Sequence, residues 1–250
     1  MVSRNELKLV RQLEQKKYRR LHGLFVAEGD KVCDDLLRTM PVYRLYSSNG
    51  RADAIAVTDD ELRRMSFLQH PQGTLGIFRM PQHSSDEEQQ AIASCATRLC
   101  LALDGVQDPG NMGTILRIAD WFGIDTVFCS ESTADVWNPK VVQATMGSIA
   151  RVRVCYTDLP ALIRSLPPST PVYGTLLDGD NIYATPLHNH GLIVMGNEGN
   201  GISDEVRRMV THRLLIPSYP ASRQGAESLN VAIATALVCG EIRRRADNII

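Results

Sequence analysis

The chain has 250 residues, with 27 lysines and arginines against 28 aspartates and glutamates, so its formal net charge is -1. Hydrophobic residues make up 44% of it, which is enough for a packed core and excludes disordered, collagen-like and coiled-coil proteins. The longest nearly uncharged apolar stretch, residues 231–240, has about half the length that a bilayer crossing needs. The charged start lacks the apolar core of a secretory signal. We therefore expect no membrane span and a cytoplasmic protein.

The first 80 residues predict a small, basic α/β domain, with 14 basic against 10 acidic residues. In the first 20 residues, seven basic and two acidic residues accompany a helical repeat of Leu7, Val10 and Leu13. The basic face of this helix is either simply exposed to solvent or a binding surface for a polyanion, since lysine and arginine near phosphates release counterions. Further along we predict strands over 24–27, 44–47, 54–57 and 73–78, and helices over 30–39 and after Thr58, which opens a capping box with Glu61.

A polar run without periodicity begins at Pro81, so we predict a linker over residues 81–96, between a domain at 1–80 and a second domain at 97–250. In the second domain, predicted strands alternate with helices, which is typical of a parallel sheet covered on both faces. The strands are expected over 98–103, 126–129, 152–155, 172–176, 191–195 and 213–216, and the helices over 111–122, after Asn138-Pro139 and over 228–245.

Cysteine, histidine and tryptophan give weak signals. The six cysteines never form C-x-x-C and lie mostly in apolar company, so we expect buried thiols. His188-Asn-His190 lacks the further ligands of a zinc site, and we predict no metal. Trp121 and Trp137 are interpreted as packed side chains, with a binding surface as the alternative for Trp137, which lies in a loop.

Ligands of open parallel sheets bind outside the carboxyl ends of the strands, so the loops there are candidate sites. The first such loop, residues 104–113, matches neither G-x-G-x-x-G nor a P-loop, because Asn111 follows Gly110 where a P-loop has lysine. Binding of a nucleotide polyphosphate is therefore not expected. Asn111 is either a helix N-cap or a site residue, and Arg117 is either a solvated residue or a site residue.

The second and third loops are also unusual. Residues 195–203 hold three glycines around Glu198; glycines permit close backbone approach, and the carboxylate favours a neutral or cationic ligand over a phosphate. The alternative is a simple turn with Ser203 as N-cap. Residues 215–231 form a long loop ending in Ser228 and Asn230, and Ser228 could serve merely as the N-cap of the last helix.

Together, the three loops resemble the three-motif signature of the SpoU/TrmH methyltransferases, over roughly residues 98–245. The motifs are Asn111-x-Gly113-x-x-x-Arg117, Gly196-Asn-Glu198-Gly-x-Gly201, and Ile216-Pro217 followed by Glu227-Ser228-Leu229-Asn230-Val231. The first 80 residues resemble, more loosely, the substrate-binding domain that often precedes this catalytic domain, including Phe25-Val-Ala-Glu-Gly29 and Pro71-Gln-Gly73.

The resemblance implies an α/β SPOUT fold with a parallel sheet and a C-terminal deep trefoil knot, preceded by a small α/β substrate-binding domain. It implies S-adenosylmethionine-dependent methylation of a ribose 2'-hydroxyl in structured RNA, by a homodimer formed through the knotted domain. The two-domain arrangement favours ribosomal over transfer RNA. The implied catalytic residues are Arg117, Asn111, Glu198, Ser228 and Asn230, and the implied cofactor contacts are Leu176 or its neighbours, Gly196, Asn197, Ile216 and Leu229.

A guanidinium stays protonated, so we expect Arg117 to grip an RNA phosphate or to stabilise the forming 2'-alkoxide rather than to act as a base. The segment 218–226 departs from the family pattern because it is longer than usual, and it would belong to the outer wall of the cofactor pocket. Two alternatives remain. A Rossmann-type nicotinamide enzyme is disfavoured by the missing G-x-G-x-x-G, and a non-catalytic RNA-binding protein on the same fold is disfavoured by the intact Arg117, Glu198 and Asn230.

Overall fold

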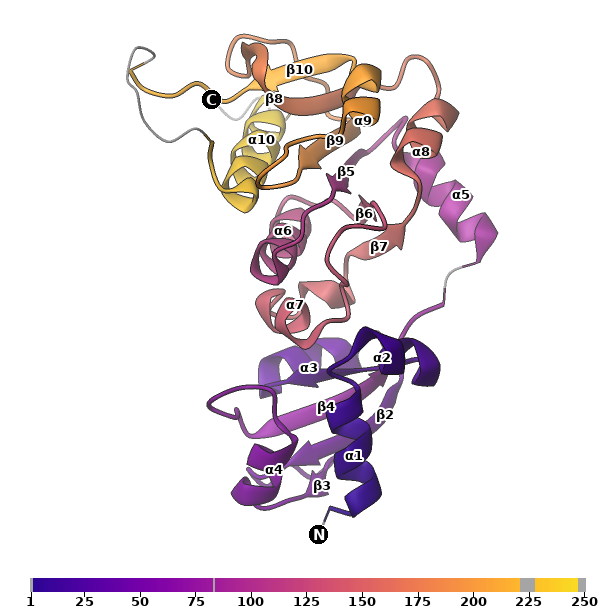
Figure 1. Ribbon diagram of the computed structural model, residues 1–250, viewed down its shortest axis with the longest axis vertical. Helices are drawn as coiled ribbons and strands as arrows, with labels where there is room; N and C mark the ends of the chain where they lie inside the picture. The colour runs from indigo at the N-terminus through magenta and orange to yellow at the C-terminus, as the bar shows by residue number, and fades with distance from the viewer. Residues whose placement is uncertain (1, 83, 221–227, 247–250) are drawn as a thin grey trace. The chain divides into compact units, whose positions relative to one another are not determined.

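The computed structural model describes residues 2–82, 84–220 and 228–246 (Figure 1). The chain forms two compact units. Unit 1 combines residues 1–82 with residues 135–151, and unit 2 combines residues 83–134 with residues 152–250. No helix within the described part is long and apolar enough to cross a membrane.

Unit 1 is built on a four-stranded sheet in the order β1-β4-β2-β3. Its strands are β1 (Leu24–Glu28), β2 (Val42–Ser47), β3 (Ile55–Ala56) and β4 (Thr74–Arg79), and its first four helices are α1 (Arg4–Gln12), α2 (Lys16–His22), α3 (Asp30–Leu37) and α4 (Asp59–Met65). The predicted capping box of α4 is present, with Thr58 and Glu61 bonding each other's backbone. The basic start forms two short helices rather than one.

Residues 135–151 leave the predicted second domain and pack with unit 1. They contain α7 (Pro139–Ala144), capped by Asn138 as predicted, and the short 3-10 helix η1 (Ser148–Ala150). The Trp137 ring lies 4.5 Å from that of Phe25, so this tryptophan is a packed residue as predicted. Arg19 of α2, only 2% exposed, donates to the Asp135 carboxylate and to the Leu13 carbonyl. This ties residues 135–151, which we call the excursion, to α2.

Unit 2 is built on a six-stranded parallel sheet in the order β10-β8-β9-β5-β6-β7 (Figure 1). The strands lie within one or two residues of their predicted starts: β5 (Leu99–Asp104), β6 (Thr126–Cys129), β7 (Arg153–Tyr156), β8 (Val172–Asn181), β9 (Gly191–Gly196) and β10 (His212–Leu215). The helices are α5 (Ser85–Ser94), α6 (Pro109–Trp121), α8 (Leu159–Ser165), α9 (Asp204–Met209) and α10 (Val231–Ala246). Buried apolar residues of α5, α8 and α9 join those of the sheet in one core.

Two expectations are corrected in unit 2. The polar run inside the predicted linker forms α5, which begins with a capping box between Ser84 and Glu87 and buries Ala91. Trp121 is 85% exposed at the end of α6, so its interpretation as a packed residue is wrong. The six cysteines are free and buried as predicted, and burial raises the pKa of both Cys33 and Cys239 to about 12.

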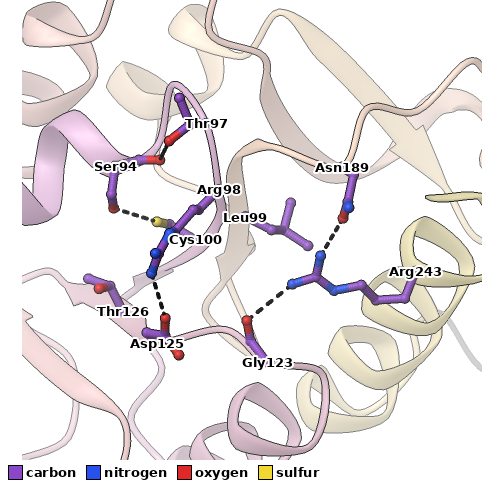
Figure 2. Close-up of a pocket in the computed structure, with 10 residues that line it drawn as sticks. All are labelled: Ser94, Thr97, Arg98, Leu99, Cys100, Gly123, Asp125, Thr126, Asn189 and Arg243. Atoms are coloured by element: carbon purple, nitrogen blue, oxygen red, sulfur yellow. Dashed lines mark hydrogen bonds and ion pairs between the residues drawn. The ribbon is translucent and has the colours of Figure 1, made fainter. Parts of the chain in front are cut away.

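A cavity of about 300 Å³ lies at the amino ends of β5 and β6 (Figure 2). Arg98 pairs there with Asp125 at 3.0 Å, and Arg243 of α10 donates to the carbonyls of Phe122 and Gly123. None of the residues that line this cavity belongs to the predicted site, whose loops follow the opposite, carboxyl ends of the strands.

Candidate active site

The site begins where β5 and β9 end side by side, since Asp104 pairs with Gly196 in the parallel register. The loops that leave these two strands therefore start next to each other. The Asp104 carboxylate accepts a hydrogen bond of 2.7 Å from the backbone N–H of Ser203, which draws the far end of the second loop back to β5. A Cβ on Gly196 would lie 2.3 Å from the carbonyl carbon of Gly201, so the folded-back loop requires glycine there.

Asn197 builds this loop. Its backbone N–H and C=O pair with Gly201, its Oδ1 accepts from the N–H groups of Gly199 and Asn200, and its Nδ2 donates to the Gly105 carbonyl at 2.7 Å. The side chain thus joins the second loop to the first. Its predicted contact with the cofactor stays a prediction.

The start of α6 frees the Asn111 side chain for other contacts. Asp108 is the N-cap, with its Oδ1 accepting from the Asn111 N–H at 2.7 Å, and Pro109 occupies the first helical position. The alternative of Asn111 as the N-cap is therefore wrong. Asp108-Pro109 is the same cap-and-proline signal as Asn138-Pro139, so the sequence does contain a signal for Asp108 as the N-cap.

Three predicted catalytic residues, one from each motif, form a single hydrogen-bonded chain. Asn230 Nδ2 donates to Asn111 Oδ1 at 2.9 Å, and Asn111 Nδ2 donates to Glu198 Oε1 at 2.9 Å. The second Glu198 oxygen accepts from the backbone N–H of Gln107 at 3.4 Å. Segments that are about 90 to 120 residues apart in sequence are thereby fixed to one another. We call Asn111, Glu198 and Asn230 the three-loop network.

Asn230 has a second role at the start of α10. Its Oδ1 accepts from the N–H groups of Ala232 and Ile233, at 2.9 and 3.2 Å, so Asn230 caps the helix while its Nδ2 reaches Asn111. The prediction that the last helix starts at Ser228 is wrong by three residues. Ser228 is exposed, and it makes no hydrogen bond with the described residues.

Arg117 lies nearly two turns along α6 from Asn111, about 9 Å along the helix axis. Its side chain is exposed, and among the described residues it has no hydrogen bond or ion pair. The three-loop network therefore does not include Arg117, and its guanidinium is open to a substrate. Residues 221–227, which precede Ser228, are outside the described part of the chain.

The remaining predicted cofactor contacts differ in accessibility. Ile216 is half-buried directly after β10, and Leu229 is 51% exposed just before α10. The Leu176 side chain is only 8% exposed and belongs to the core, whereas its neighbour Leu177 is 76% exposed. If this part of β8 contacts a cofactor, it does so through the backbone or Leu177. Most of the lengthened segment 218–226 lies outside the described residues.

One serine hydroxyl and one threonine hydroxyl hold the first loop in place, and neither was predicted from the sequence. Ser130 Oγ and Thr133 Oγ1, which follow β6, both accept from the Gly105 N–H, at 2.9 and 3.2 Å. Small hydroxyl residues are common in loops, so no sequence pattern distinguishes these two. The described residues contain no group of three or more metal-ligating side chains, and the site offers hydrogen bonds, a carboxylate and a nearby guanidinium for chemistry.

Comparison with known protein families identifies the family of the chain. The model of the SpoU rRNA Methylase family matches residues 98–240, more than half of the chain, so the chain belongs to that family. The model of the MRM3-like substrate binding domain matches residues 4–76.

Individual relatives match along nearly the whole chain. The 23S rRNA (guanosine(2553)-2'-O)-methyltransferase RlmP of Bacillus subtilis is 29% identical over 245 residues, covering 93% of this chain and 94% of the relative. A TrmH-family structure from Porphyromonas gingivalis has a TM-score of 0.83 and 40% identity, covering 98% and 99% of the two chains. An AdoMet-bound rRNA methyltransferase from Sinorhizobium meliloti has a TM-score of 0.83 and 28% identity, covering 98% and 97%.

Proposed function

We propose that this chain transfers a methyl group from S-adenosylmethionine to a ribose 2'-hydroxyl of ribosomal RNA. The three-loop network carries the proposal, because it brings the three family motifs together at the carboxyl edge of the sheet, where ligands of such sheets bind. Two of the relatives named above are rRNA methyltransferases, which favours ribosomal RNA as the substrate. Transfer RNA is the alternative substrate, and a comparison of methyl transfer to the two RNAs separates them.

The residues around the loops fit S-adenosylmethionine by their chemistry. The half-buried Ile216 and the exposed Leu229 offer apolar contact for an adenine ring, and the carboxylate of Glu198 suits a ligand that carries positive charge. The folded-back backbone after Gly196 can approach a ligand closely. When bound, the cofactor supplies an electrophilic methyl group on a sulfonium.

Methyl transfer to a hydroxyl needs a nucleophile held in line and close to the methyl carbon, so positioning supplies much of the acceleration. In this proposal the three-loop network keeps the loops rigid, and Ser228, at the edge of the site, contacts the ribose. Arg117 binds the RNA phosphate beside the target or stabilises the negative charge that develops on the 2'-oxygen.

Arg117→Ala tests this assignment. We expect loss of methylation by at least about a hundredfold, as for other donors to developing charge. S-adenosylmethionine affinity should be nearly unchanged, because Arg117 takes no part in the hydrogen bonds of the three-loop network. Isothermal titration calorimetry measures the affinity, and transfer of tritiated methyl groups measures the activity. Arg63→Ala on α4 of unit 1 is a matched control, since Arg63 is 66% exposed. Loss of cofactor binding in Arg117→Ala would sink the assignment.

We further propose a homodimer through unit 2. Leu229, just before α10, and Ile233 and Leu237 of α10 recur every four residues and are 51, 54 and 40% exposed, which is an apolar stripe that the described residues leave uncovered. Ile233→Asp combined with Leu237→Asp should convert the dimer to a monomer in light scattering. A wild-type protein that is monomeric at micromolar concentration would refute the dimer.

Three further proposals rest on the family resemblance. They are the deep trefoil knot of the C-terminal segment, docking of RNA by unit 1, and a cytoplasmic location where ribosomal RNA is available. The division of the enzyme into a substrate-binding domain over 1–80, a linker over 81–96 and a methyltransferase domain over 97–250 is proposed on the same basis. Residues 135–151 are added to the first part, and α5, which joins the core of unit 2, to the last.

A further inference from the structure

One end of the sheet of unit 1 carries an exposed tyrosine between two arginines. Tyr43 of β2 is 38% exposed, the Arg44 Cζ lies 5.4 Å from its ring centroid, and the Arg79 Cζ lies 5.6 Å from it. We call Tyr43, Arg44 and Arg79 the tyrosine–arginine patch. Both guanidiniums are within the range of a cation–π contact.

Backbone hydrogen bonds bring α2 to the same place. The Arg79 N–H donates to the Pro41 carbonyl at 3.0 Å, which joins the end of β4 to the start of β2. The next residue, Met80, donates to the carbonyl of Gly23, the C-cap of α2, at 2.8 Å. Arg20 and Leu21 of α2 precede Gly23 by three and two residues, so this hydrogen bond brings their segment next to the end of β4 that carries Arg79. Both side chains are exposed, Leu21 by 70%.

The patch carries positive charge without carboxylate partners. Among the described residues, no ion pair joins Arg20, Arg44 or Arg79 to an acidic side chain, whereas many other arginines are paired, including Arg51, Arg63, Arg98, Arg164, Arg207 and Arg213. The Glu6 carboxylate interacts with Arg44 through its charge, but its oxygens already accept hydrogen bonds from Ser3 and Tyr46. The free guanidiniums are therefore available to an anionic partner.

We propose that the tyrosine–arginine patch binds a single-stranded segment of the RNA substrate, a contact that rests on the RNA-methylating function proposed above. An RNA base stacks on Tyr43, and the guanidinium that it displaces from the ring turns to a neighbouring phosphate. Aromatic and guanidinium planes both stack on unpaired bases, and every base has a face to offer, so the contact tolerates different sequences. Paired bases within a duplex are already stacked, which makes a duplex the poorer partner.

Binding of short RNA to the full chain tests the proposal. The probes are a fluorescein-labelled 12-nucleotide oligouridylate and the duplex that it forms with oligoadenylate, titrated by anisotropy at several salt concentrations. Tyr43→Ala should weaken single-strand binding at least about fivefold, the lower end for loss of one base stack, while Tyr43→Phe stays within about twofold. Arg44→Ala and Arg79→Ala should each lower the salt slope by about 0.7, the value for one phosphate contact on a single strand.

Two controls match these variants. Tyr183→Ala in unit 2 removes a tyrosine that is 51% exposed, and Arg63→Ala in unit 1 removes an arginine that is 66% exposed; both should bind oligouridylate like the wild type. Circular dichroism and S-adenosylmethionine titration confirm that each variant is folded. In methyl transfer, Tyr43→Ala should raise the KM for RNA with kcat unchanged.

Several results would overturn the patch as an RNA site. These are equal affinity of Tyr43→Ala and wild type, an equal loss in Tyr183→Ala, or tighter binding of the duplex than of the single strand. They are distinguishable from failure of the proposed function, in which the wild type binds oligouridylate through Tyr43 and yet transfers no methyl group to any ribosomal RNA.

Discussion

Asn111→Asp replaces one amide nitrogen of the three-loop network by an oxygen and keeps the shape of the side chain. In the wild type, Asn111 Nδ2 donates to Glu198 Oε1 at 2.9 Å, and Asn230 Nδ2 donates to Asn111 Oδ1 at the same distance. The substitution preserves the acceptor for Asn230 but sets a second carboxylate against Glu198. The second loop should therefore move away from α6, and with it the proposed cofactor site.

The size of the effect follows from two losses. A hydrogen bond to a charged group contributes about 1.5–3 kcal/mol, and two like charges about 4 Å apart repel by about 1 kcal/mol in water and about 4 kcal/mol at an effective dielectric of 20. Glu198 is exposed, so the lower ends apply. We expect a total of about 2–3 kcal/mol, which is roughly a 30- to 150-fold loss of S-adenosylmethionine affinity.

The double variant Asn111→Asp with Glu198→Gln restores the polarity, because the new amide at position 198 can donate to the new carboxylate at position 111. Calorimetry should show weaker S-adenosylmethionine binding in each single variant, and an affinity within about fivefold of the wild type in the double variant. The two substitutions would then compensate each other, with a coupling energy opposite in sign to the two separate losses. Additive losses in the double variant would refute the reasoning that this hydrogen bond holds the loops together.

Two further perturbations act on neighbouring elements. Gly196→Ala should lower the unfolding free energy by about 1–3 kcal/mol and weaken cofactor binding, because its Cβ would lie 2.3 Å from Gly201; Gly199→Ala, whose Cβ has 3.6 Å of clearance, is the control in thermal unfolding. Glu241, 7% exposed, has its pKa lowered to about 2, chiefly by hydrogen bonds from Arg244 and then from Arg245. Because its pKa is lowered, the Glu241 carboxylate stabilises the fold at pH values above the usual glutamate pKa, and this stabilisation is lost as pH falls toward 2. Glu241→Gln should therefore lower the free energy of unfolding by about 1–2 kcal/mol at pH 7, after screening of the half-exposed Arg244. The loss should be smaller in acid-unfolding titrations below pH 4. A difference that persists unchanged at pH 2.5 would contradict this.

Strands β5, β6 and β9 could be predicted from the sequence because each is a short buried apolar run between polar loops, and buried parallel strands need no partner-specific signal. Helix α5 could not be predicted from periodicity, since its exposed, acidic first turns hide the few apolar residues that it buries. Its capping box, Ser84 with Glu87, was the available signal.

The site residues could be listed from the sequence, but their connections could not. Ser228 and Asn230 can both cap a helix, and only the tertiary bond from Asn230 to Asn111 explains why Asn230 does so. The same holds for the excursion 135–151, which is held by Arg19, a residue of the basic start whose partner Asp135 lies 116 positions away. Contacts at such separations leave no local pattern.

Methyl transfer to ribosomal RNA tests the central proposal most directly. The purified chain is incubated with tritiated S-adenosylmethionine and unmodified ribosomal RNA, and the RNA is digested with alkali, which leaves dinucleotides intact only where the ribose carries a 2'-O-methyl group. We predict label in alkali-resistant dinucleotides for the wild type and none for Arg117→Ala. Label confined to base-methylated mononucleotides, or equal label with Arg117→Ala, would contradict the account.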